Sequence, residues 1–151
     1  MLGLFKKKSL LSSEDNKRVV EAIRATEQLT SGEIRVYLES RNPLVSTIER
    51  AQEIFLILNM QATRQRNGVL LYIAVKDHEV ALIGDEGIHQ LVGTEFWNTQ
   101  VQQMIGFFKE NHLADGIVKC VAEVGNVLIE KFPFDPHTDK NELPDDVVFG
   151  K

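Results

Sequence analysis

The clearest pattern of apolar and polar positions lies at the centre of the chain, in residues 67–89, NGVLLYIAVKDHEVALIGDEGIH. A turn dipeptide, Asn67-Gly68, precedes seven consecutive apolar residues at 69–75. So short a run, rich in Val, Ile, Leu and Tyr, predicts a strand that is buried on both faces. A second apolar run, 80–83, follows four polar residues and predicts an antiparallel hairpin with the first run. The hairpin ends in GDEG at 84–87, where two glycines allow close approach of the backbone.

Before this hairpin, the spacing predicts a helix, a strand and a second helix. Apolar residues recur at helical spacing over 13–28. EIRVYLE at 33–39 alternates strictly and predicts a strand with one strongly apolar face. A capping box formed by Ser46 and Glu49 starts the second helix, whose apolar stripe extends through Ala62 and ends near residue 64. Together with the run at 69–75, these elements predict a right-handed βαβ crossover with parallel strands.

The part of the chain after residue 87 is predicted to be mainly helical. A short helical turn at 88–92 is followed by a long helix that Thr94 can cap, and a last helix spans about 115–131. The expected fold is α/β: an α/β/α sandwich with a small mixed sheet, flanked by about four helices. The expected organisation is a flexible N-terminus at 1–12, a single domain at 13–134 and an acidic, extended tail at 135–151. Within that tail, residues 147–149 can dock on the domain.

Composition restricts the class of function. The chain has 151 residues, enough for one domain, and a formal net charge of −5. A negative charge argues against binding nucleic acid, which depends on Lys and Arg facing phosphates. A single cysteine, Cys120, allows no intramolecular disulfide and fits a reducing compartment. We therefore expect a cytoplasmic protein, monomeric, with an unknown protein partner.

The N-terminal sequence, MLGLFKKKSLL, gives no sign of a signal peptide, because only Leu10 and Leu11 follow its lysines. No segment approaches the ~20 apolar residues that span a bilayer. A frayed terminus is the favoured interpretation. The alternative is a weak peripheral membrane contact through Leu2, Leu4 and Phe5 together with the lysines.

Carboxylates are predicted to gather at one edge of the sheet. An antiparallel strand ends where its parallel neighbours begin, so residues 84–87 should lie beside Glu33 and Asn67. Asp85, Glu86 and Glu33 would then supply hard oxygen ligands of the kind that suit calcium or magnesium. Asp115 could join them if the last helix folds back over this edge. The alternative is structural: Asp85 and Asp115 cap helices, and Glu33 is solvated.

Other reactive residue types give weaker signals. His89 follows the acidic turn and could act as a base or ligand, although a surface or capping role is favoured. Cys120 lies on an apolar helical stripe, where a small core residue is the expected role. The chain contains no nucleophile elbow, P-loop or GxGxxG motif.

A family resemblance emerges from these segments taken together. TSGEIRVYLE, RNGVLLYIAVKDHEVALIGDEGIH, GTEFW, DGI and NELPDDVVF occur in order over about 13–149, and this set resembles the TPM domain family, most of all its short stand-alone bacterial members. The resemblance implies an α/β/α sandwich and recurrent binding of divalent cations, especially calcium, near acidic loops. Carried over by position, it implies Asp85, Glu86 and Asp115 as ligands, whereas Glu33 comes from the topology alone. Relatives include thylakoid-lumen proteins with a proposed acid phosphatase activity and membrane-attached receptor modulators.

Two functions follow as hypotheses. The favoured one is a non-enzymatic module that binds calcium or magnesium and contacts a partner protein. The alternative is a metal-dependent acid phosphatase, in which the ion polarises the phosphoryl group and His89 or a carboxylate handles protons. No catalytic nucleophile is identifiable in the sequence.

Overall fold

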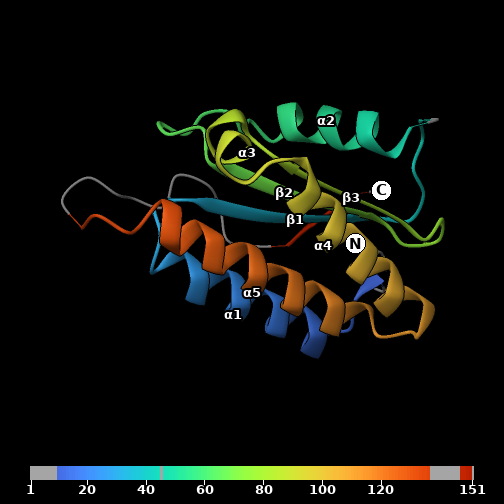
Figure 1. Cartoon of the computed structure of the whole chain (residues 1–151). Coiled ribbons are helices and arrows are strands. Elements are labelled where there is room, and N and C mark those ends of the chain that lie inside the picture. Colours follow the sequence, from blue (N-terminus) through green and yellow to red (C-terminus); the bar gives the residue numbers. More distant parts are fainter. Residues whose placement is uncertain (1–9, 45, 137–146, 151) are drawn as a thin grey trace.

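The computed structural model describes residues 10–44, 46–136 and 147–150. In this part of the chain a four-stranded sheet, in the order β3-β2-β1-β4, lies between two layers of helices (Figure 1). One face packs against α1, α4 and α5, and the other is covered by α2 (Figure 1). The elements are α1 (Ser13–Glu27), β1 (Glu33–Glu39), α2 (Thr47–Ile57), β2 (Gly68–Ala74), β3 (Glu79–Gly84), α3 (Glu86–Val92), α4 (Thr94–Lys109), α5 (Leu113–Lys131) and β4 (Val148–Phe149).

The sheet is mixed, which confirms the predicted α/β/α sandwich. β1 and β2 are parallel, with Glu33 opposite Gly68, and β2 and β3 form the antiparallel hairpin. The predicted docking of residues 147–149 is also confirmed, because β4 pairs in parallel with β1 through Tyr37 and Leu38. The Gly150 N–H adds a hydrogen bond of 2.6 Å to the Leu38 carbonyl oxygen. The tail thus contributes a fourth strand to the sheet.

Two apolar clusters fill the space on either side of the sheet. The larger one joins alternate residues of β1 and β2 to α1, α4 and α5, and it includes Trp97 and Cys120. The smaller one lies between the sheet and α2 and includes Phe55 and Tyr72. The prediction that the central run is buried on both faces is confirmed for residues 69–74, because every residue of β2 is buried and its side chains alternate between the two clusters. Val75 follows the strand and is half-buried.

The second helix is shorter than its pattern predicts. α2 ends at Ile57 rather than near residue 64, and Asn59 takes a left-handed conformation with φ of 57°. Met60 then folds into the smaller cluster and is fully buried, while Ala62 is exposed. The apolar spacing continues past the helix because the following loop also packs on the sheet. Thr94 likewise is the first residue of α4 and not its cap, which is Gly93.

The polar face of β1 is buried as well as its apolar face. Glu33, Arg35 and Glu39 are 3%, 8% and 2% exposed. They alternate with Ile34, Val36 and Leu38, which belong to the larger cluster, so they lie on the face of the sheet that carries α2. The alternative that Glu33 is solvated is therefore wrong.

The first described residues pack on the domain. Leu11 is buried, and the Ser12 hydroxyl caps α1 by accepting a hydrogen bond of 3.0 Å from the Asp15 N–H. The predicted membrane contact through Leu2, Leu4 and Phe5 falls outside the described residues, as does most of the tail. In the described part of the chain, no helix combines the length and apolar character needed to cross a bilayer.

Candidate functional site

The predicted edge of the sheet is formed as the topology requires. Glu33 lies opposite Gly68, and its N–H points to the Asn67 carbonyl oxygen at 3.4 Å. On the other side of Gly68, the Asp85 N–H donates to the Gly68 carbonyl oxygen at 2.9 Å. Three segments far apart in sequence therefore meet at one end of the sheet. We call the group of Glu33, Arg66, Asn67, Asp85 and Glu86 the acidic edge.

Asp85 is the most constrained carboxylate at the acidic edge. It is 7% exposed and caps α3, since its side chain accepts a hydrogen bond of 2.8 Å from the Glu86 N–H. Arg66 binds both of its oxygens, with nitrogen–oxygen distances of 2.7 and 2.9 Å. The predicted capping role of Asp85 is thus confirmed. The structure adds a bidentate partner, Arg66, that sequence reasoning missed.

A glycine allows the turn with Arg66 to pack against α3. Arg66 has a φ of 51°, and its carbonyl oxygen accepts a hydrogen bond of 2.8 Å from the Gly87 N–H. A Cβ atom at Gly87 would lie 2.1 Å from the Gln65 carbonyl oxygen. Only a residue without a side chain lets the two backbones come so close. Gly87 thereby fixes Arg66 beside Asp85.

A buried amide lies next to these charges. Asn67 is 1% exposed, and its Nδ2 donates to the Ser31 hydroxyl oxygen at 3.3 Å. Gln65 donates to the same oxygen at 3.1 Å. The Asn67 Oδ1 is buried and has no hydrogen-bond partner among the described residues. A buried oxygen left without a donor costs free energy, of the order of 1–3 kcal/mol, so this position favours an additional ligand.

The remaining predicted ligands are not brought together in the same way. Glu86 is at the acidic edge, but its side chain is 65% exposed and its oxygen lies 3.8 Å from Arg66. Asp115 is in the first turn of α5, at the opposite end of the molecule from the edge. Thr30, which adjoins the edge, donates to the carbonyl oxygen of Leu128, 13 residues further along α5. At about 1.5 Å per residue, that separation is about 20 Å.

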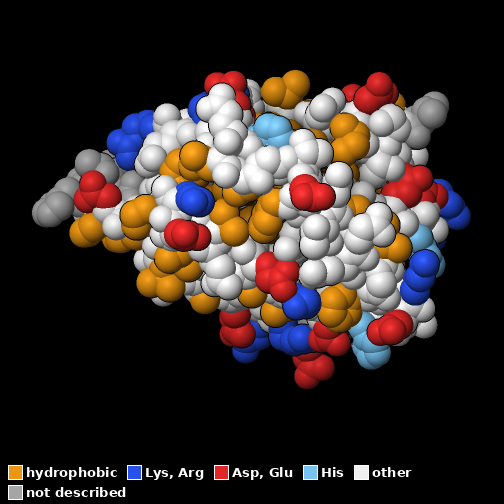
Figure 2. All heavy atoms as spheres, viewed as in Figure 1, with side chains coloured by type: hydrophobic (Ala, Val, Ile, Leu, Met, Phe, Trp, Pro, Cys, Tyr) orange, Lys and Arg blue, Asp and Glu red, His pale blue; other side chains and the backbone are white. Residues whose placement is uncertain are grey.

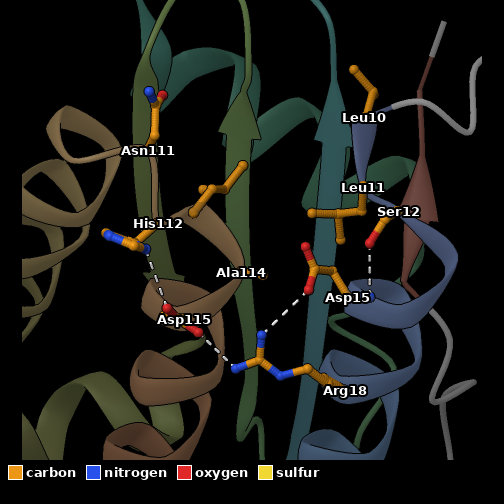
Figure 3. Close-up of a pocket in the computed structure, with 10 residues that line it drawn as sticks. Leu10, Leu11, Ser12, Asp15, Arg18, Asn111, His112, Ala114 and Asp115 are labelled. Atoms are coloured by element: carbon orange, nitrogen blue, oxygen red, sulfur yellow. Dashed lines mark hydrogen bonds and ion pairs between the residues drawn. The ribbon is translucent and has the colours of Figure 1, made fainter.

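Asp115 belongs instead to a pocket between the first turns of α1 and α5 (Figure 3). Arg18 approaches it at 2.7 Å and also bridges to Asp15, and His112 Nδ1 lies 3.5 Å from its other oxygen. The hydrogen bond from Arg18 lowers the pKa of Asp115 below its usual value. The predicted joining of Asp115 to the other carboxylates is therefore wrong, because the C-terminal end of α5 lies at the acidic edge. The described residues contain no group of three or more His, Cys, Asp or Glu side chains arranged to hold a metal ion.

His89 has a hydrogen-bond partner, and Cys120 is buried in the core. The Trp97 indole N–H donates to His89 Nδ1 at 3.0 Å, which leaves Nε2 as the only ring nitrogen of His89 available for chemistry. Cys120 is 3% exposed, and burial raises the pKa of its thiol to about 12. A thiolate nucleophile is therefore not available at neutral pH.

A second polar cluster was not anticipated from the sequence. Arg50 on α2 donates through Nε and Nη2 to the Glu39 carboxylate, with both distances at 2.8 Å. The Tyr72 hydroxyl donates to the same carboxylate, and Arg50 also contacts Glu53. A usable signal was present: Glu39 ends the first strand of a βαβ crossover, and the helix that follows must return over that end of the sheet.

Figure 2 shows acidic and basic side chains scattered over the visible face, with exposed apolar side chains between them. No extended basic patch covers this face, which agrees with the net charge of −5.

The chain is similar to proteins of known sequence and structure. The model of the TPM domain matches residues 4–127. The solution structure of the BA42 protein from the psychrophilic bacterium Bizionia argentinensis is 37% identical, with a TM-score of 0.84, and the match covers 93% of this chain and 95% of that one. No curated protein matches the chain.

Two further solution structures share the fold. An N-terminal domain from P. gingivalis is 16% identical with a TM-score of 0.66, over 82% of this chain and 79% of that one. The N-terminal domain of cg2496 from Corynebacterium glutamicum is also 16% identical, with a TM-score of 0.57, over 78% and 74%. Taken with the match over residues 4–127, the mixed sheet between two helical layers identifies the chain as a member of the TPM domain family.

Proposed function

We propose that this TPM-domain protein binds a divalent cation, calcium or magnesium, at the acidic edge, and that the ion controls contact with a partner protein. The observation that carries the proposal is the buried Asp85 carboxylate at the acidic edge, where the Asn67 Oδ1 is also buried and has no hydrogen-bond partner among the described residues. Both are hard oxygen donors of the type that these ions prefer. Asp115 is not part of the proposed site, because it lies at the other end of α5.

Arg66 is the counter-charge that an incoming ion would replace. Its side chain is 42% exposed, so the guanidinium can turn into solvent and leave both Asp85 oxygens to the ion. Glu86, which is exposed on the next residue, can then add a further carboxylate oxygen. Water would complete the six to eight oxygens that calcium takes. A site with so few charged ligands, and with an arginine to displace, should bind weakly.

The partner contact is proposed for the hollow next to the same residues. A hollow of about 370 Å³ is lined by Phe55, Leu56, Ile83, Arg66 and Asp85, among others. Leu56 is 62% exposed. An ion on Asp85 would release Arg66 at the end of this apolar hollow. We therefore expect a partner segment that presents an apolar side chain next to a carboxylate.

The alternative function, a metal-dependent phosphatase, would use the same ion to polarise a phosphoryl group. In that case His89 would have to act through Nε2, since Nδ1 accepts from Trp97. Hydrolysis of an aryl phosphate that persists through repeated purification and disappears in Asp85→Asn would support this alternative. Activity that survives the substitution would identify a contaminant.

The test of cation binding is a calcium titration followed by backbone amide NMR shifts and repeated with magnesium. Asp85→Asn should weaken binding by about tenfold or more. Arg66→Gln should strengthen binding, because the ion no longer competes with a guanidinium. Asp115→Asn is the matched control, a carboxylate that is also paired with an arginine, and should leave the affinity unchanged. Unchanged affinity in Asp85→Asn would remove this residue from the site, and the absence of saturable shifts would refute the proposal.

A further inference from the structure

A pocket lies at the opposite end of the sheet from the acidic edge. It encloses about 450 Å³, and Tyr37, Glu39, Arg41, Arg50 and Phe149 contribute to its wall. Glu39 and its neighbour Ala74 are the last residues of the parallel strands β1 and β2. Ligands of open α/β sheets characteristically bind outside the carboxyl ends of the strands. The position of this pocket is therefore one where a ligand is expected.

The inner wall is a fixed network of charges. Glu39 is 2% exposed, and its two oxygens accept from Arg50 and from the Tyr72 hydroxyl. Its lone pairs are thus directed to partners within the protein. Arg50 has five N–H donors, of which Glu39 and Glu53 take three in the described part of the structure. Two N–H donors of a rigidly held guanidinium remain for a ligand.

The outer wall adds further donors. The Arg41 side chain is 68% exposed, and one of its nitrogens lies 2.6 Å from Asp77, which leaves its other N–H groups unassigned. Burial, followed by the charge of Glu39, raises the pKa of Tyr37, so its hydroxyl keeps its proton at neutral pH and can donate. Among the described residues that line the pocket, side-chain donors therefore outnumber the available side-chain acceptors.

Aromatic rings and a glycine determine the shape of the remaining wall. The Tyr37 ring stacks on Tyr72 with centroids 6.1 Å apart, and Phe149 of β4 also lines the pocket. A Cβ atom at Gly150 would lie 2.4 Å from the Tyr37 hydroxyl oxygen, so β4 approaches this phenol closely. Phe149 is paired with Leu38 and its side chain packs against the larger cluster on the other face of the sheet, so the Tyr37 ring and two guanidinium groups bound the pocket. A ring of this kind favours a flat, apolar group on the ligand.

We propose that this pocket binds a small organic oxyanion, a carboxylate or a phosphate-like group carried on an aromatic ring. Arg41 and Arg50 provide charge-assisted hydrogen bonds to the anion, a contact for which arginine geometry is well suited. Tyr37 contacts the ring. The site is separate from the acidic edge, so either proposal can fail without the other.

The test uses non-hydrolysable probes that separate the two parts of the ligand. Phenylphosphonate and benzoate carry both the ring and the oxyanion, methylphosphonate carries only the oxyanion, and benzamide carries only the ring. Each is titrated into the isotope-labelled full chain and followed by amide shifts. We expect saturable shifts at Tyr37, Arg41 and Gly150 with the first two probes, and affinity at least about tenfold lower for the other two.

Substitutions then assign the shifts to the pocket. Arg41→Gln changes an exposed residue, so the fold should persist. The affinity for phenylphosphonate should fall by about tenfold. Arg18→Gln is the matched control, an arginine that is likewise paired with aspartate but lies outside this pocket, and should leave the affinity unchanged. Tyr37→Phe should give an intermediate loss. Equal effects of Arg41→Gln and Arg18→Gln, or shifts that do not saturate, would overturn the proposal.

Discussion

The ion pair between Glu39 and Arg50 leads to a quantitative prediction for stability. Arg50→Gln leaves the Glu39 carboxylate, whose side chain is 3% exposed, with the Tyr72 hydroxyl as its remaining donor among the described residues. Two charge-assisted hydrogen bonds of 2.8 Å are lost, and each contributes about 1.5–3 kcal/mol. The sum agrees with the cost of about 3–5 kcal/mol for removing one partner of a buried ion pair. For a domain of this size, we expect the melting temperature to fall by about 6–20 °C.

The assay is urea unfolding followed by circular dichroism, with a thermal melt as an independent check. The matched control is Arg41→Gln, whose side chain is 68% exposed and whose exposed ion pair with Asp77 should contribute little to stability. The double variant Glu39→Gln/Arg50→Gln should be more stable than Arg50→Gln alone, because no charge is then buried without a partner. A cost below about 1 kcal/mol for Arg50→Gln, or no recovery in the double variant, would refute the reasoning.

Two further predictions test other parts of the structure. Gly87→Ala should cost about 1–3 kcal/mol in urea unfolding, because its Cβ would lie 2.1 Å from a backbone oxygen that cannot readily move. Gly106→Ala is the control, because no atom lies within 4 Å of a Cβ placed there. This alanine should stabilise α4 by up to about 1 kcal/mol. Equal effects of the two substitutions on the free energy of unfolding would contradict this interpretation. The hydrogen bond from the Asn42 N–H, and then Arg41, lower the pKa of Asp77 below its usual value. The contribution of Asp77 to the free energy of unfolding is therefore fully present above that usual value, and it is lost as the pH falls through the lowered pKa. The free energy of unfolding of Asp77→Asn should therefore fall less on acidification than that of the unchanged protein. If the two free energies fall in parallel with pH, Asp77 does not contribute.

Much of the fold could be predicted because its signals are local. The alternation of β1, the apolar run of β2 and the hairpin to β3 each follow from a few neighbouring residues. The meeting of Glu33, Asn67 and Asp85 also followed, since an antiparallel strand must end beside the start of its parallel neighbours.

Other features depended on tertiary packing. The distance of Asp115 from the acidic edge is set by the direction in which α5 crosses the sheet, and no local pattern encodes that direction. The partners of Asp85 and Glu39 are arginines in a loop and on a helix, Arg66 and Arg50, whose charge alone does not distinguish them from solvated arginines. The burial of the polar face of β1 was missed for the same reason, because alternation indicates which residues share a face but not whether that face is covered.

The single tryptophan and the single cysteine, which can both report on unfolding, lie in the same apolar cluster. Trp97 and Cys120, the single tryptophan and the single cysteine, both belong to the larger cluster beneath α1, α4 and α5. Indole fluorescence and thiol labelling therefore follow the opening of that layer. The α2 layer could detach without changing either signal, since its cluster relies on Phe55, Met60 and Tyr72. Amide exchange in α2 that is faster than thiol labelling of Cys120 would thus divide this small domain into two cooperative units with separate opening free energies.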